Sequence, residues 1–187
     1  RAVLQFLHAG PTVPVHELRL MLIGDAEAGK TSLQQALKAP SHRADRIGKE
    51  ERTVGIDISP LALTGAGPSV NALLYDLAGQ DVYTVSHAMH FTARCIYLLL
   101  WKPGETMEAA LTSISRWLET LSVYVPDAIV VLVGSHSQSL PDDEYRQLHS
   151  RVHERVQAKV AELNDLTQLE AMKLHGLYKC AADKAKT

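Results

Sequence analysis

Short apolar runs recur along the chain, and most of them are apolar on both faces. They occupy residues 18–24, 70–77, 95–101, 128–134 and 174–180. Strands of a parallel sheet that is covered by helices have this pattern, whereas strands with one solvated face alternate apolar and polar residues. Helical periodicity lies between the runs, most clearly over 107–121 and 148–163. The alternation predicts an open α/β sheet with right-handed crossovers.

One pair of segments departs from this alternation. Residues 55–63 and 70–77 are joined by TGAGPS, which is too short to contain a helix. A connection that carries Gly and Pro between two apolar segments predicts a hairpin. The first of these segments is therefore expected to be an antiparallel edge strand beside a mostly parallel sheet.

Domain boundaries are suggested at both ends of the chain. Residues 1–9 look like the end of a helix and GPTVP, residues 10–14, like a linker. We expect 1–14 to connect from a preceding region and 15–187 to form one domain. The final residues, AADKAKT, show no obvious terminal helix. The chain therefore looks like a piece of something larger whose usual terminal helix is lacking.

Composition narrows the class of protein. A chain of 187 residues with 46% hydrophobic content can bury the core of one compact domain. The formal charge of −2, with acids and bases mixed, gives no electrostatic footprint for nucleic acid or an anionic membrane. Neither a signal peptide nor a membrane-spanning run is recognisable, and Cys95 and Cys180 lie in apolar stretches. We expect no nucleic-acid partner, no direct membrane insertion and a reducing, cytoplasmic setting.

A phosphate-binding loop is the strongest motif. Residues 24–31 read GDAEAGKT and match GxxxxGK[ST] between a predicted strand and a predicted helix. Glycines let the backbone curl around phosphates, while successive N–H groups and the helix N-terminus face the anion. The predicted nucleotide contacts are Gly24, Asp25, Ala26, Glu27, Ala28, Gly29, Lys30, Thr31 and Ser32. Lys30 supplies positive charge at the β and γ positions, and the Thr31 hydroxyl can bind Mg²⁺.

Two further segments have the character of switches. A polar stretch over 38–52 leads into TVGID, whose Thr53 is a candidate to close over Mg²⁺ and the γ-phosphate. DLAGQ follows the strand NALLY directly, so Asp76 can reach Mg²⁺ through water and the Gly79 N–H can approach the γ-phosphate. Gln80 stands where a glutamine orients the attacking water. The predicted metal residues are Thr31, Thr53 and Asp76, and the predicted catalytic residues are Gln80 and Lys30.

These motifs together resemble the Roc (Ras of complex proteins) domains of Roco proteins such as the leucine-rich-repeat kinases. The resemblance rests on TVGID (53–57), DLAGQ (76–80), YTVSHAMHFTARCIYLLLW (83–101) and VGSHS (133–137), and covers roughly 15–182. It implies a Ras-like P-loop GTPase fold, with a six-stranded, mostly parallel sheet and helices on both faces. It also implies a small GTPase that takes GTP/GDP with Mg²⁺. A neighbouring COR domain, preceding repeats, a kinase and a possible homodimer are implied as partners.

The same resemblance assigns the base-recognition motif. Ser135, His136 and Gln138 stand in it: His136 would lie against the purine face, and Gln138 replaces the expected aspartate. A carboxylate accepts from both N1–H and N2–H₂ of guanine, whereas a neutral amide has one acceptor oxygen. The change should cost about 1–2 kcal/mol, a factor of about 5–30 in affinity. After the last strand, Cys180 and Ala181 fall where a backbone N–H makes the final base contact.

The sequence leaves two functional hypotheses from different classes. The main one is a Mg²⁺-dependent GTPase with slow turnover that acts as a regulatory switch; no arginine finger is assignable, since a solvated basic loop explains Arg43, Arg46 and Arg52 equally well. The rival is a non-catalytic interaction or dimerisation module with a weakened nucleotide pocket, which Gln138 favours. An adenine-using P-loop enzyme is third, and TVGID argues against it.

Several other residues admit an alternative role. His149 and His153 have the spacing of a metal pair on a helix but no apparent third ligand, so a solvated helix flank is favoured. Cys95 is expected to pack in a core strand rather than act as a nucleophile. His87 and His90 could modulate the second switch, although packing or surface roles are favoured. Asp142 and Asp143 could swing toward the base, but capping the following helix is favoured.

Overall fold

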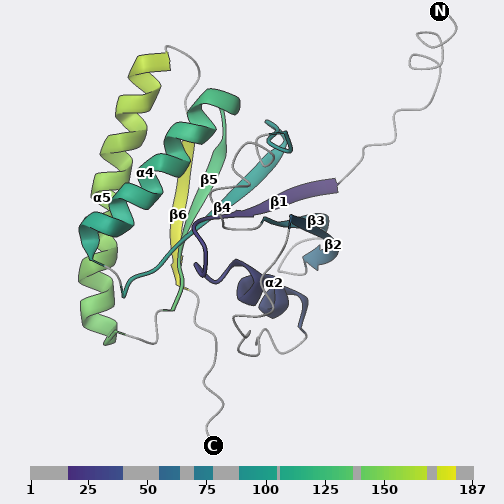
Figure 1. The fold of residues 1–187 in the computed structure, drawn as a ribbon, viewed down its shortest axis with the longest axis horizontal. Coiled ribbons are helices and arrows are strands. Elements are labelled where there is room, and N and C mark those ends of the chain that lie inside the picture. Colours follow the sequence, from purple (N-terminus) through teal and green to yellow (C-terminus); the bar gives the residue numbers. More distant parts are fainter. Residues whose placement is uncertain are drawn as a thin grey trace, which may run out of the picture.

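The computed structural model describes residues 17–39, 55–63, 70–77, 89–104, 106–136, 140–167 and 172–179. Within these ranges the chain forms a six-stranded sheet with helices packed on it (Figure 1). The elements are β1 (Glu17–Ile23), α2 (Lys30–Lys38), β2 (Ile56–Leu63), β3 (Val70–Leu77), β4 (Cys95–Trp101), α4 (Met107–Tyr124), β5 (Ile129–Gly134), α5 (Asp142–Thr167) and β6 (Lys173–Lys179). None of the helices in this described part combines the length and the apolar character that a membrane crossing requires.

The strand order is β2-β3-β1-β4-β5-β6. β2 pairs with β3 in the antiparallel sense, while all other neighbouring strands are parallel. The predicted fold class and the antiparallel edge strand are therefore confirmed. β1 lies between β3 and β4 in the sheet, so the strand order reverses direction at β1. Open α/β sheets bind ligands at such a reversal, outside the carboxyl ends of the strands.

Both faces of the sheet are covered, which explains why its strands are apolar on both sides (Figure 1). On one face α4 and α5 pack together, and their residues Ile114, Leu118 and Val156 join a core that includes Met21 and Tyr97. On the other face α2 covers a smaller core through its half-buried Leu33 and Leu37. β1 serves both cores because successive side chains of a strand point to opposite faces.

The helix starts are set by polar residues. Thr106 is the N-cap of α4, and its side chain accepts a hydrogen bond from the Ala109 N–H at 3.3 Å. α5 begins at Asp142, six residues before the periodic stretch that predicted it. The expectation that Asp142 and Asp143 cap this helix is wrong in position, because both lie in its first turn. Acidic side chains there face the positive end of the helix dipole.

Candidate functional site

The loop between β1 and α2 has a backbone that requires glycine at two places. Gly24 has φ 138°, and a Cβ added to it would lie 2.5 Å from the Leu100 carbonyl oxygen at the end of β4. Gly29 has φ 85° and forms the N-cap of α2. Glu27 adopts φ 60°, a left-handed conformation that non-glycine residues seldom take. The loop therefore curls tightly at the carboxyl edge of the sheet, as the motif predicts.

Lys30 lies inside this loop rather than in solvent. Its side chain is only 6% exposed, and its ammonium donates to the carbonyl oxygens of Gly24 and Asp25, both at 2.8 Å. Burial lowers the Lys30 pKa from 10.5 to about 8, although the charges of Asp76 and Asp25 oppose the shift. At neutral pH the loop thus holds a buried positive charge that is poorly solvated.

This buried charge has a consequence for stability without any ligand. The Lys30 pKa is about 8 in the folded chain and 10.5 ordinarily, so between these values the unfolded chain binds the extra proton. The free energy of unfolding should therefore rise as pH increases through this window, by about 2 kcal/mol between roughly pH 7.5 and roughly pH 9.5. Urea unfolding at the two pH values checks this. Lys30→Met should lose the increment, and an equal rise in that variant would contradict the assignment.

Thr31 and Asp76 come together from elements that lie far apart in the sequence. The Thr31 hydroxyl, in the first turn of α2, donates to Oδ2 of Asp76 on β3 at 2.7 Å, across a separation of 45 residues. Asp76 has no exposed surface. A hydroxyl and a buried carboxylate are oxygen ligands of the kind that Mg²⁺ prefers. The donor set therefore fits the metal that the fold family implies.

The first turn of α2 complements this oxygen pair. It contains no acidic side chain, and Ser32 is half-buried within it. Backbone N–H groups of a helix N-terminus have no partner inside the helix and carry partial positive charge. Together with Lys30 they form an environment suited to an anion.

Ser135 and His136 follow β5 and meet the loop from the other side. The Ser135 N–H and hydroxyl both donate to the Trp101 carbonyl oxygen, at 2.9 and 3.0 Å. Ser135 Oγ also lies 2.9 Å from His136 Nδ1. The direction of this second hydrogen bond depends on which ring nitrogen of His136 carries the proton. Ser135 thus links the end of β4 to the His136 imidazole.

The two halves of the predicted site touch at Gly29. A Cβ added there would lie 3.3 Å from both Ser135 Cβ and His136 Cε1. His136 is exposed and has φ 50°, another left-handed non-glycine residue. Ser135 and His136 therefore lie beside the loop 24–29, although more than a hundred residues separate them from Gly29 in the sequence.

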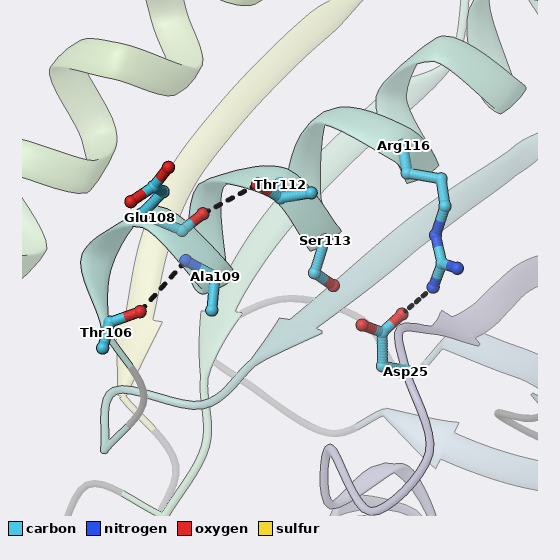
Figure 2. Close-up of a pocket in the computed structure, with 7 residues that line it drawn as sticks. All are labelled: Asp25, Thr106, Glu108, Ala109, Thr112, Ser113 and Arg116. Carbon is cyan, nitrogen blue, oxygen red and sulfur yellow. Dashed lines mark hydrogen bonds and ion pairs between the residues drawn. The ribbon is translucent and has the colours of Figure 1, made fainter.

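Asp25 has partners that the sequence does not reveal. Its Oδ1 accepts from Arg116 Nη2 at 2.5 Å (Figure 2). The same oxygen accepts from Trp117 Nε1 at 3.0 Å, and both donors lie on α4. Burial alone would raise the Asp25 pKa, but hydrogen bonds from Ser113 and Trp117 and the Arg116 charge outweigh it and lower that pKa. The motif predicts Asp25 only as part of the loop, and it predicts no role for Arg116 or Trp117. Nothing local in the sequence marks the contact, since the partners lie 91 and 92 residues away.

A cavity of about 470 Å³ opens beside this contact. Figure 2 shows Asp25 and Arg116 at one end of it and the first turn of α4 at the other. Hydroxyl groups of Thr106, Thr112 and Ser113 contribute to its lining. The cavity therefore has a mixed polar and apolar lining, and it includes Asp25 of the loop.

Several predicted residues lie outside the described part of the chain. They are Thr53, Gly79, Gln80, Gln138, Cys180 and Ala181, together with the alternatives Arg43, Arg46, Arg52 and His87. Their assignments stay predictions. Of the predicted set, the structure brings together the loop 24–29, Lys30, Thr31, Asp76, Ser135 and His136.

The structure also shows the surroundings of those remaining alternatives that lie in the described part of the chain. Cys95 is 2% exposed, and burial raises the pKa of its thiol to about 12, which confirms a packing role. His149 packs against Tyr145 with ring centroids 5.5 Å apart. Among the residues with described positions, no group of three or more His, Cys, Asp or Glu is placed to hold a metal. His90 is exposed in a turn.

Comparison with known proteins agrees with this arrangement. A family described as "Ras of Complex, Roc, domain of DAPkinase" matches residues 19–138. The chain is 22% identical over 188 residues to the "Probable serine/threonine-protein kinase pats1" of Dictyostelium discoideum, which covers 92% of this chain and 6% of that protein. It is 29% identical over 103 residues to a "Roc-COR-CHAT protease" of an unknown prokaryotic organism, covering 50% of this chain and 10% of the relative.

A Ras-related relative matches as well. "Ras-related protein Rab-26" of Bos taurus is 31% identical over 116 residues, which cover 62% of this chain and 43% of the relative. The chain thus spans only a small part of the first two proteins and less than half of Rab-26. The family match extends from β1 to the segment after β5 and includes every described residue of the candidate site. The chain belongs to the Roc, Ras of Complex, domain family.

Proposed function

We propose that this Roc domain binds GTP and GDP with Mg²⁺ and hydrolyses GTP slowly, as a regulatory switch in a larger multidomain protein. One observation carries the proposal: the Lys30 ammonium is buried in a glycine-dependent loop, at the N-terminus of α2 and beside the Thr31–Asp76 pair. Among the described residues the Lys30 ammonium donates to two backbone carbonyls, and such a buried cation gains strongly from a polyanionic ligand because phosphate oxygens carry full charge.

The chemistry follows from these groups. The loop N–H groups and Lys30 would hold the phosphates, and the tight curl that Gly24 and Gly29 permit would direct those N–H groups toward them. Thr31 and Asp76 would hold Mg²⁺, with Thr53 as a third predicted residue. The metal, when bound, neutralises charge on the β and γ oxygens. Gln80 would position the attacking water.

The expected low rate rests on the lack of an assignable arginine finger. Such an arginine contributes about 10³–10⁵ to hydrolysis in this class of enzyme. Arg116 is the arginine that lies nearest to the loop among the described contacts, yet its guanidinium is bound to Asp25. We therefore propose slow intrinsic turnover, with any acceleration supplied by a partner.

The names of the relatives support a multidomain context. One is called a Roc-COR-CHAT protease, and pats1 is called a probable serine/threonine-protein kinase. We propose that residues 15–187 are the Roc unit, that 1–14 connect it to a preceding region, and that a COR domain, repeats or a kinase accompany it in the parent chain. Homodimerisation and a cytoplasmic setting belong to the same proposal.

A second candidate function is favoured by one position. Gln138 stands where a carboxylate would read guanine. With one acceptor oxygen instead of two, the domain would discriminate guanine poorly and could serve as a weakly nucleotide-binding interaction module. The two candidates differ in whether phosphate is released from GTP.

Titration of the purified 187-residue chain with labelled GTP, GDP and ATP in Mg²⁺, followed by phosphate-release measurements, tests the proposal. Gln138→Asp should tighten GTP by about 5–30-fold because a charged acceptor replaces a neutral one, and should change ATP affinity little. Gln157→Asp makes the same chemical change on the exposed face of α5 and should alter neither affinity. Absence of nucleotide binding would overturn the proposed function, and equal gains for GTP and ATP would overturn the role of Gln138.

A further inference from the structure

We infer that Arg116 and Trp117 of α4 are positioning residues for the phosphate-binding loop, and that they act through the side chain of Asp25. This inference rests on the proposed function for its effect on nucleotide affinity. The contact itself is independent of that function, because it joins the loop to α4 through side-chain hydrogen bonds that involve no ligand. We call the three side chains of Asp25, Arg116 and Trp117 the loop latch.

The latch holds one carboxylate oxygen in place. Both donors converge on Oδ1 of Asp25 from two directions (Arg116 and Asp25 are drawn in Figure 2). Trp117 is 5% exposed and belongs to the core between the sheet and α4. Its indole N–H is therefore a fixed donor, and the Asp25 carboxylate is held at the position that this core side chain defines.

The held carboxylate in turn restrains the loop backbone. The Asp25 carbonyl oxygen accepts from Lys30 Nζ at 2.8 Å and from the Ala28 N–H at 3.2 Å. Aspartate has one methylene between its backbone and its carboxyl group, so holding the carboxylate also restrains the carbonyl. The latch thus fixes the turn 25–28 and one of the two acceptors that aim the Lys30 ammonium.

The latch also balances charge in the loop. The Asp25 carboxylate attracts the buried Lys30 ammonium. A bare carboxylate in a phosphate-binding loop would also repel the ligand, but Arg116 neutralises it at contact distance. Because its partners lower the Asp25 pKa, the carboxylate remains ionised at neutral pH. The latch therefore supplies geometry and charge balance together.

The proposed role of the loop latch differs measurably from that of an ion pair that only stabilises the fold. The Arg116 and Asp25 side chains are 50% and 39% exposed, and pairs of such exposure contribute little to stability. Loss of the latch should therefore weaken ligand binding more than it destabilises the fold. A purely structural pair would do the reverse or would change neither.

The test measures GTP·Mg²⁺ affinity and urea unfolding for a set of latch variants of the whole chain. Asp25→Ala should weaken binding about 5–20-fold and Arg116→Gln about 3–10-fold, as expected for hydrogen bonds to charged groups. The double variant should be no weaker than Asp25→Ala, because both changes break one contact. Asp25→Asn keeps an acceptor oxygen for Trp117 and should recover part of the loss. Trp117→Phe removes the N–H donor together with part of a buried ring, so it should weaken binding and also lower the free energy of unfolding.

A control comes from the same helix. Glu119 of α4 pairs with Lys159 of α5 at 2.9 Å and has no contact with the loop among the described interactions. Glu119→Gln should leave nucleotide affinity unchanged. Unchanged or tighter binding in Asp25→Ala, or additive losses in the double variant, would overturn the inference.

A second readout needs no nucleotide, so failure of the proposed function remains distinguishable from failure of the latch. The Asp25 carbonyl oxygen accepts a hydrogen bond from the Ala28 N–H, and loss of the latch should weaken this bond. Amide hydrogen exchange at Ala28 should therefore be faster in Asp25→Ala than in the wild-type chain, and Glu119→Gln should not change it. If the wild-type chain binds no nucleotide but exchange at Ala28 is faster in Asp25→Ala, the proposed function fails and the latch stands; unchanged exchange would contradict the latch.

Discussion

Lys30→Met should weaken binding of GTP·Mg²⁺ by about 10²–10⁴-fold, the largest effect expected of any single change in this domain. The ammonium is buried, so it would make charged hydrogen bonds to two phosphates at low local dielectric, each contributing about 1.5–3 kcal/mol. Methionine keeps the length and packing of the side chain while removing its charge. Fluorescence titration with labelled GTP measures the loss directly.

The same substitution at Lys38, at the other end of α2, shows whether the effect of Lys30→Met depends on the position of Lys30 in the loop. Lys38 lies in the last turn of this helix, 3.9 Å from Asp57, with 37% of its side chain exposed. Lys38→Met should bind GTP within about twofold of the wild-type chain, since an exposed pair contributes at most about 1 kcal/mol. Equal losses in the two variants would point to general electrostatic attraction and would remove Lys30 from its proposed role.

Gly24→Ala should destabilise the fold by about 3–5 kcal/mol, measured by urea unfolding without nucleotide. Two costs add at this position. The φ of 138° lies in a region that is nearly restricted to glycine, which costs about 1–3 kcal/mol for other residues. The new methyl group would also meet the Leu100 carbonyl oxygen at 2.5 Å, and forcing backbone apart costs a similar amount.

Gly55 provides the comparison for this prediction. It has φ 78°, and a Cβ added there has no described atom within 4 Å. Gly55→Ala should therefore show the conformational cost alone, about 1–2 kcal/mol. If both alanine variants lose the same stability, close contact between the loop and β4 is not the reason that position 24 is glycine.

Much of the fold could be predicted because it depends on local periodicity. The five apolar runs match five strands to within one residue at each end, and the short Gly-Pro connection identifies the antiparallel edge. Burial on both faces explains why the runs are continuous rather than alternating. The apolar stripe predicts the helix over 142–167 but not its start, because the first turn of that helix is acidic and exposed.

The candidate site could be predicted only where chemistry is encoded by neighbouring residues. GDAEAGKT contains its own spacing, so Lys30 and Thr31 can be assigned from the sequence alone, whereas the Thr31–Asp76 contact is seen only in the folded chain. The latch cannot be found in this way. Asp25 and Arg116 are 91 residues apart, and each is an ordinary polar residue in its own segment. The left-handed backbone conformation at Glu27 and His136 likewise cannot be recognised from the sequence, because neither residue is glycine.

The indole of Trp117 has a practical consequence for following this domain in solution. The chain contains two tryptophans, and both Trp101 and Trp117 are nearly buried. Indole emission responds to charge close to the ring, and the Trp117 indole N–H donates a hydrogen bond to the Asp25 carboxylate. With Trp101 replaced by phenylalanine, Trp117 would remain as the single tryptophan. It is hydrogen-bonded to the loop that is expected to bind phosphate. The fluorescence of Trp117 could therefore report changes in the conformation of the loop without an added label.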